Sequence, residues 1–219
     1  MYFLHANELQ EVWAFALGHS PAKDFENWVL SNPTVQRILG KELTEELTIA
    51  DYRDRHRVAD LRKRLFDWAL PSAPARWRSL QFDELQYVAL GDDSVRRLLP
   101  IGYWHTGPGS DLPHPREYLD PSWDEAERSQ TLDYMDSAYV LGGSLGFSWC
   151  RMRCSMVVAD IGHRDLTDGM WAFPEGFAHY LRHHAVKPDM AFLGHVRKNG
   201  YRVPDLPVRL GGKPLRRVR

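Results

Sequence analysis

Cysteine, net charge and long apolar runs are all scarce in this sequence. Its 219 residues include two cysteines, Cys150 and Cys154, and carry a formal net charge of −1. Two cysteines so close together cannot cross-link a long loop, which excludes a disulfide-rich secreted scaffold. No stretch approaches the roughly 20 apolar residues of a membrane span, and the first residues lack the features of a secretion signal. These absences predict a cytoplasmic protein with no membrane partner.

Charge is unevenly distributed along the chain although its sum is nearly zero. Residues 71–136 contain 6 basic and 12 acidic side chains, whereas residues 137–219 contain 13 basic and 6 acidic ones. A net charge near zero provides no long-range attraction for nucleic acid, so we expect no nucleic-acid partner. The acidic middle and the basic end are compatible with mutual attraction, with two different partners, or with separate solvated faces.

Apolar residues are present in sufficient number for a buried core, at 43% of the chain with 12% aromatic. In the first third they recur at the spacing of an amphipathic helix, as at Leu9, Val12, Trp13 and Ala16. Further helical segments are predicted around Phe25 to Val29, at 34–39, at 42–49 and at 53–70. The N-terminal part of the protein is therefore expected to be entirely helical.

The C-terminal half has mixed character. Residues 137–152 have strand composition, Thr167-Asp168-Gly169 predicts a turn, and a helix is expected to open at Pro174. Together these patterns predict an α+β fold in which a helical part packs on a small antiparallel sheet with C-terminal helices. The expected parts are a helical module at 1–70, an acidic loop-rich middle at 71–136, a strand–turn–strand–helix module at 137–202 and a basic extended tail at 203–219.

The cysteine pair has the C-x3-C spacing of half a zinc site, because thiolates on a tight turn converge on one ion. The other half would have to come from histidines. His163 is the nearest, followed by His179, His183 and His184, and the pair 179/183 would share a helical face. A zinc site at Cys150, Cys154, His163 and His179 is one interpretation. Buried inert thiols on a strand and a redox or nucleophilic cysteine are the others.

A polar cluster surrounds the segment GHRDLTDG. It contains Asp160, Asp165 and Asp168 together with His163 and Glu175. Paired carboxylates can perform acid–base chemistry or hold a divalent ion. Aspartates in turns also bind their own backbone, and this second interpretation is the one the sequence favours.

A loop rich in proline, glycine and aromatic residues is expected between residues 102 and 122. Aromatic residues in a loop either anchor a binding partner or pin the loop to a core. Acidic side chains in and after this loop would complement a basic partner. The predicted partner-binding residues are Trp104, His105, Asp111, Glu117, Asp120, Trp123, Asp124 and Glu125.

Two segments resemble modules of bacterial proteins. Residues 22–65, AKDFENWVLSNPTVQRILGKELTEELTIADYRDRHRVADLRKRL, are similar to a helical module of immunity proteins that accompany secreted polymorphic toxins. Residues 164–192 resemble a C-terminal module of the form LTDGxWxWPEGLxHYVxxHxVxxP. The matching positions are Leu166, Thr167, Asp168, Gly169, Trp171, Pro174, Glu175, Gly176, His179, Tyr180, His184, Val186 and Pro188, and Phe173 departs from the pattern.

The resemblance implies a non-enzymatic immunity protein that neutralises a toxin by binding it stoichiometrically. Its partner would be a secreted toxin domain, and a basic nuclease would suit the acidic middle of the chain. No catalytic residue is implied. No cofactor is expected for such a protein. The alternative function is that of a small zinc-binding protein or enzyme centred on Cys150, Cys154, His163 and His179, for which zinc would be the cofactor.

Overall fold

The expected α+β class is confirmed by the computed structural model, which describes residues 6–73, 80–89, 95–154 and 161–218. The chain divides into an N-terminal unit, Met1–Glu84, and a C-terminal unit, Leu85–Arg219. The division falls inside the stretch that the sequence analysis grouped as one acidic middle. Every helix in the described ranges is too short or too polar to cross a membrane.

The N-terminal unit is built from helices, as its periodicity predicts. They are α1 (Ala6–Ala16), α2 (Ala22–Leu30), α3 (Pro33–Leu39), α4 (Lys41–Ile49) and α5 (Arg55–Ala69), with 3-10 turns at Leu70–Ser72 and Phe82–Glu84. Polar residues mark where two of these helices begin. The side chain of Asn32 accepts from the N–H of Val35, and Asp54 accepts from the N–H groups of His56 and Arg57.

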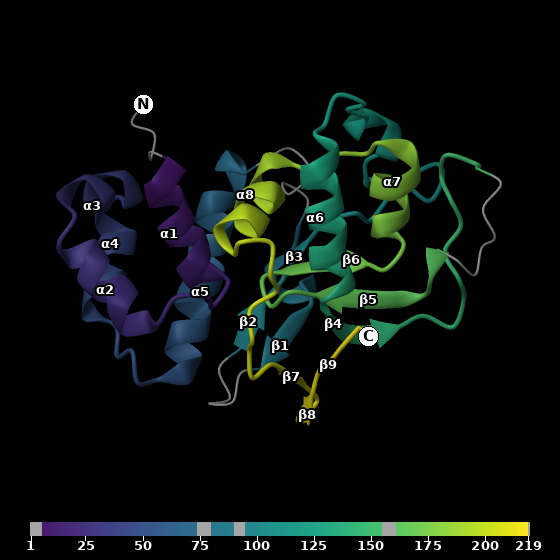
Figure 1. Cartoon of the computed structure of the whole chain (residues 1–219). Helices are drawn as coiled ribbons and strands as arrows, with labels where there is room; N and C mark the ends of the chain where they lie inside the picture. Colours follow the sequence, from purple (N-terminus) through teal and green to yellow (C-terminus); the bar gives the residue numbers. More distant parts are fainter. Residues whose placement is uncertain (1–5, 74–79, 90–94, 155–160, 219) are drawn as a thin grey trace. The chain divides into compact units, whose positions relative to one another are not determined.

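Aromatic rings form much of the core of the N-terminal unit. Phe66 on α5 meets Trp13 on α1 edge-on, with ring centroids 5.4 Å apart, and lies at the same distance from Phe82. Phe15 stacks on Phe25 with centroids 4.2 Å apart. Helix α1 therefore lies along α5, as Figure 1 also shows.

In its described residues, the C-terminal unit combines short strands with three α-helices. Its helices are α6 (Glu125–Asp136), α7 (Phe177–His184) and α8 (Met190–Lys198), with a 3-10 turn at Pro115–Tyr118. Its strands are β1 (Tyr87–Ala89), β2 (Val95–Arg97), β3 (Leu99–Pro100), β4 (Tyr139–Gly143), β5 (Arg164–Thr167), β6 (Trp171–Pro174), β7 (Arg209–Leu210), β8 (Lys213–Pro214) and β9 (Arg216–Arg217).

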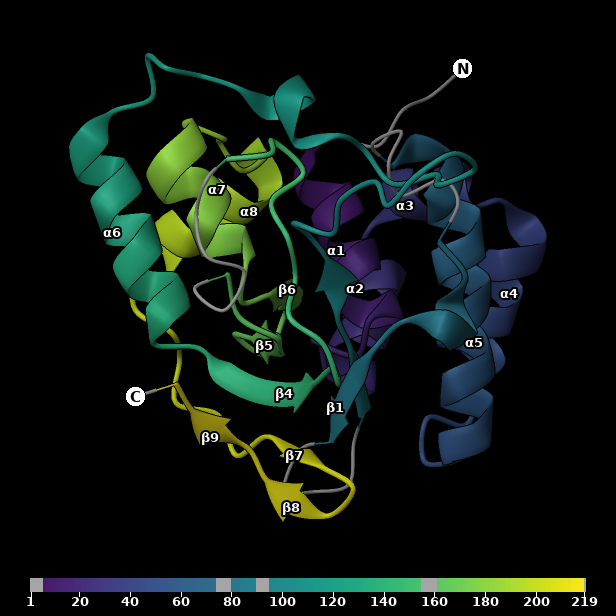
Figure 2. The same ribbon diagram turned by 90° about the vertical axis from the view of Figure 1, so that its right-hand side faces the viewer.

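These strands form two sheets with the orders β2-β1-β7-β8 and β3-β6-β5-β4-β9. All pairs are antiparallel except β3 and β6, which run parallel. The basic tail contributes to both sheets, because β7 pairs with β1 and β9 pairs with β4 (Figure 2). The tail is predicted from the sequence to be extended, but its pairing with β1 and β4 is not predicted.

The three helices lie together on one side of the five-stranded sheet (Figure 1). Phe192 of α8 is fully buried and is the centre of this packing. Its ring centroid lies 5.5 Å from Trp171, 6.0 Å from Phe173 and 6.3 Å from Phe177. Helix α7 is thus packed onto the sheet through Phe192.

The turn between β5 and β6 is held by Asp168, which is almost fully buried. One carboxylate oxygen accepts from the N–H groups of Met170 and Trp171 at 2.8 and 2.7 Å. The other accepts from the hydroxyl of Tyr134 at 2.8 Å and lies 3.3 Å from Nε2 of His195. For Asp168, turn formation is the role the structure shows.

Two local predictions are wrong. Residues 144–152 are not a strand, because β4 ends at Gly143. Pro174 does not open a helix; it ends β6, and α7 begins at Phe177. Helix α6 is capped by Asp124, since the Asp124 side chain accepts from the N–H of Glu127.

Candidate metal centre

Both cysteines lie in the irregular segment that follows β4. The N–H of Ser148 donates to the carbonyl of Gly162 at 3.0 Å, which fixes this segment beside the chain that enters β5. The N–H of Arg153 then donates to the carbonyl of Cys150 at 3.0 Å, and Arg153 adopts a left-handed φ of 56°. This tight turn brings Cys154 back toward Cys150.

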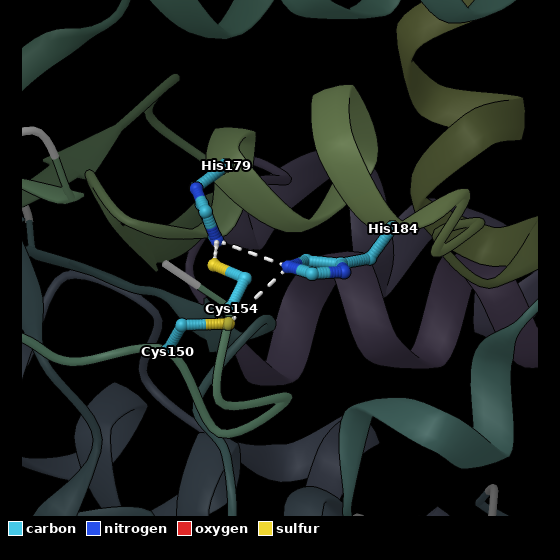
Figure 3. Close-up of side chains that lie close together, drawn as sticks. All are labelled: Cys150, Cys154, His179 and His184. Carbon is cyan, nitrogen blue, oxygen red and sulfur yellow. Dashed lines mark hydrogen bonds between the residues drawn. The ribbon is translucent and has the colours of Figure 1, made fainter. Parts of the chain in front are cut away.

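Two histidines of α7 face the cysteine turn (Figure 3). His179 lies within the helix and is 4% exposed, and His184 is the last helical residue. The helix ends there because Ala185 takes a left-handed φ of 50° and its N–H donates to the carbonyl of Tyr180. The helix terminus thereby holds the His184 ring next to that of His179.

The four side chains converge on one point. The Sγ atom of Cys150 lies 3.3 Å from Nε2 of His184, and Sγ of Cys154 lies 3.4 Å from Nε2 of His179. The two Nε2 atoms are 3.2 Å apart. All four potential ligand atoms lie within 4.8 Å of one another. Two sulfurs and two ring nitrogens therefore surround a space of atomic size.

These separations match the edges of a tetrahedral metal site. Zinc binds thiolate sulfur at about 2.3 Å and imidazole nitrogen at about 2.0–2.1 Å, so tetrahedral ligands lie about 3.3–3.8 Å from one another. Three of the separations, 3.2 to 3.4 Å, lie at or just below the short end of that range. One ion at the centre would therefore reach all four ligands with little rearrangement.

The histidines are in the protonation state that ligation requires. Burial, reinforced by the nearby charges of His184, His183 and Arg182, lowers the pKa of His179 to about 4. Burial also lowers the pKa of His184. Both rings are neutral at pH 7 and offer a nitrogen lone pair. Burial raises the pKa of the Cys150 thiol, so without an ion this cysteine is protonated and is a poor nucleophile.

Hydrogen-bond donors surround the Cys150 sulfur. The backbone N–H of Met152 donates to Sγ at 3.3 Å. Burial raises the pKa of Tyr180 to about 12, so its hydroxyl keeps a proton that it shares with the Cys150 sulfur. The Tyr180 oxygen in turn accepts from the N–H of Arg151 at 2.8 Å. Such donors stabilise a thiolate and orient it toward a metal ion.

The structure brings together three of the four residues in the ligand set that the sequence analysis preferred. Cys150, Cys154 and His179 meet, but the fourth member of the group is His184 and not His163. The His163 ring packs edge-on against Phe147 with centroids 5.3 Å apart. The sequence contained a usable signal, because the spacing His179-x4-His184 fits the H-x3–5-H half of a Cys2His2 site.

The polar cluster next to this site is occupied by internal contacts. Asp165 accepts from the hydroxyl of Tyr103 at 2.9 Å. Glu175 accepts from the N–H groups of His163 and Arg164 and forms an ion pair with the Arg164 guanidinium. Asp160 lies outside the described residues. These contacts give Asp165 and Glu175 structural roles.

The residues predicted to bind a partner are spread over the loop before α6 and its first turn, and most have partners within the chain. Trp104 packs against the rings of Tyr118, Phe177 and Tyr180. Trp123 is 5% exposed, and its indole N–H donates to Glu127. Four others also have partners within the chain. Glu117 takes part in a capping box, and Asp124 caps α6. Asp120 pairs with Lys187, and the ring of His105 lies 6.3 Å from that of His114. Asp111 and Glu125 are exposed.

Comparison with known proteins gives no match for this chain among protein-family models, curated proteins or solved structures.

Proposed function

We propose that this protein binds one zinc ion through Cys150, Cys154, His179 and His184. The observation that carries the proposal is the convergence of two sulfurs and two ring nitrogens within 4.8 Å of one another. Hydrogen bonds can link these groups in a chain, from Cys150 to His184, from His184 to His179 and from His179 to Cys154, but such a chain does not need all four atoms to face one point. A tetrahedral cation does require it.

Zinc fits the donor set better than other common ions. Magnesium and calcium prefer oxygen ligands, and no carboxylate belongs to this four-residue group. Two thiolates with two imidazoles in a tetrahedral arrangement are typical of zinc. A charged ion would also lower the pKa of the Cys150 thiol, which burial alone raises.

A site with four protein ligands leaves no position for a reacting water, so the proposed role is structural and not enzymatic. The ion would tie the turn at Cys150 to the C-terminal half of α7, two segments that are separate in sequence. Reducing compartments keep neighbouring thiols available as ligands, and the proposal therefore places the protein in the cytoplasm.

The test is metal analysis of untagged protein purified without chelators. We expect about one zinc per chain, and replacement by cobalt should give the absorption of a tetrahedral ion with thiolate ligands. Cys150→Ser and His184→Ala should each lose stoichiometric zinc. Wild-type protein that holds no stoichiometric metal, even after reduction and zinc addition, would overturn the proposal.

Two histidine variants separate this ligand set from its alternatives. His183→Ala changes the neighbour of His184 on the same helix, and its ring lies 5.1 Å from that of His179. His163→Ala removes the fourth ligand expected from sequence. Both variants should keep zinc if the structure identifies the ligands correctly. Loss of zinc from His163→Ala alone would favour the set expected from sequence.

A second candidate function is that of an immunity protein which binds a secreted toxin domain. The observation that favours a protein partner is the exposure of Leu145 and Phe147, at 112% and 54%, in the segment after β4. Large apolar side chains exposed on a surface are a feature of interaction sites. If a toxin domain is encoded beside the gene of this protein, that domain is the first ligand to test by calorimetry.

Variants of both surfaces would distinguish where such a toxin binds. Leu145→Asp with Phe147→Asp should weaken binding through the apolar segment. Asp111→Lys with Glu125→Lys should weaken it through the acidic surface predicted from sequence. Unchanged affinity in both double variants would exclude both surfaces, and absence of binding by the wild type would exclude that toxin as the partner.

A further inference from the structure

A cationic cavity lies beside the cysteine turn in the C-terminal unit. Its volume is about 420 Å³, within the range of small-molecule sites. Three arginines line it: Arg116, Arg151 and Arg153. His105 and His114 also contribute, and no carboxylate does among the described residues. The cavity is therefore suited to an anion.

The arginines of this cavity are not neutralised within the described ranges. None of the three takes part in an ion pair there. Guanidinium groups brought to one cavity repel one another, and a phosphate would relieve that repulsion while accepting several N–H groups. Phosphate is thus the anion that this set of donors fits best.

Arg151 is held in position for such a role. Its guanidinium lies over the ring of Trp149, 3.8 Å from the centroid, and its Nη1 donates to the Trp149 carbonyl at 3.2 Å. A fixed guanidinium loses less conformational entropy when it binds an anion. Because Arg151 and Arg153 lie between Cys150 and Cys154, the turn that carries the cysteines also presents both arginines.

An adjoining cavity of about 240 Å³ has different chemistry. Tyr103, Trp104 and Tyr180 give it aromatic walls, and Ser144 and Ser148 add hydroxyl groups. Thr106, Trp149 and Arg151 line both cavities. A ligand that enters both would carry a phosphate at one end and a flat ring with hydrogen-bonding edges at the other.

We propose that the two cavities together bind a nucleoside phosphate, with the phosphate among the three arginines and the base in the aromatic cavity. The ligand is either a free nucleotide or the 5′-phosphorylated end of a strand, because both have the same chemistry. This site is distinct from the proposed zinc centre, but the turn between Cys150 and Cys154 contributes residues to both. Zinc content is therefore measured in every sample.

The test is calorimetry of the full zinc-loaded chain with the four common nucleoside 5′-monophosphates at low salt. At least one should bind with a stoichiometry of one. The corresponding nucleoside and inorganic phosphate should each bind at least about tenfold more weakly, because each lacks one half of the contacts. No binding by any of the four, or equal binding of the nucleoside, would overturn the proposal.

Arg116 provides the sharpest variant because it lies on the 3-10 turn at Pro115–Tyr118, away from the cysteines. Arg116→Gln should keep its zinc and weaken nucleotide binding by about tenfold or more. The matched control is Arg128→Gln on α6, whose guanidinium pairs with Glu125 and lines neither cavity. Equal affinities of Arg116→Gln and the wild type would contradict the assignment.

Two further experiments identify the source of the ligand and distinguish the nucleotide site from the zinc centre. A 5′-phosphorylated oligonucleotide that binds more tightly than its monophosphate would assign the site to strand ends; weaker binding would assign it to free nucleotides. Nucleotide binding by wild-type protein that takes up no zinc, even after reduction and zinc addition, would leave this site intact and overturn the metal centre. A zinc-loaded chain that binds no nucleotide would overturn the nucleotide site and leave the metal centre intact.

Discussion

The two units of the chain differ in what holds them together. In the N-terminal unit, long helices bury aromatic and aliphatic side chains such as Phe66 and Phe15. In the C-terminal unit, an aromatic core around Phe192 is supplemented by specific polar contacts: Asp168 holds the turn between β5 and β6, and Glu127 of α6 binds Arg197 of α8. The comparison teaches that the helical unit rests mainly on a regular apolar pattern, whereas the other unit adds to its core a stronger dependence on individual hydrogen-bond acceptors.

The largest expected effect is that of Asp168→Ala in the C-terminal unit. The substitution leaves the hydroxyl of Tyr134 and the N–H of Trp171 buried without their acceptor. Each lost partner costs about 1–3 kcal/mol, so we expect a loss of about 4 kcal/mol in the free energy of unfolding. Urea unfolding measures the loss, and hydrogen exchange locates it. Exchange that rises equally in both units would show that they unfold as one.

An effect of comparable size but of a different kind is expected from Phe66→Ala in the N-terminal unit. Phe66 is fully buried between Trp13 and Phe82, so its removal leaves a cavity. Such truncations cost about 3–5 kcal/mol, and Phe66→Leu should recover more than half of that because it refills most of the volume. Asp168→Asn should recover much less. If Phe66→Leu and Asp168→Asn recovered equal fractions of the lost stability, the proposed difference between the two units would be contradicted.

The difference between the units also explains what could be predicted from sequence. The helices of the N-terminal unit follow from local spacing and caps, as for α5 and Asp54. The cysteine turn does not, because Cys150 and Cys154 are brought to His179 by hydrogen bonds between segments distant in sequence. His163 is closer in sequence than His184, but the α7 terminus determines which ring reaches the sulfurs.

Lowering the pH should destabilise the C-terminal unit through protonation of Glu127. This carboxylate accepts from Arg197 at 2.6 Å, Trp123 at 2.9 Å and Tyr201 at 3.2 Å, and the bond from Arg197 above all lowers its pKa to about 2. A lowered folded-state pKa stabilises the fold above the unfolded value of 4.5, and this contribution is lost as pH falls toward 2.

The measurement is the stability of the wild type and of Glu127→Gln between pH 6 and pH 2. We expect the variant to be less stable by about 1.5–3 kcal/mol at pH 6, with the difference shrinking as the pH falls. Comparing the two proteins cancels the titration of the other carboxylates. A difference that stays constant with pH would show that Glu127 acts by packing and not by charge.

The smallest expected effect returns to the N-terminal unit, where Asp54→Ala removes the cap of α5. The Asp54 carboxylate accepts from the N–H groups of His56 and Arg57 at 2.9 and 3.3 Å on an exposed helix end. Exposed N–H groups can turn to water, so the loss should be about 1 kcal/mol, and Asp54→Ser should restore most of it. Thermal unfolding measures the change. A loss as large as that of Asp168→Ala would contradict the comparison, because single acceptors would then matter as much in the helical unit as in the unit built from short strands.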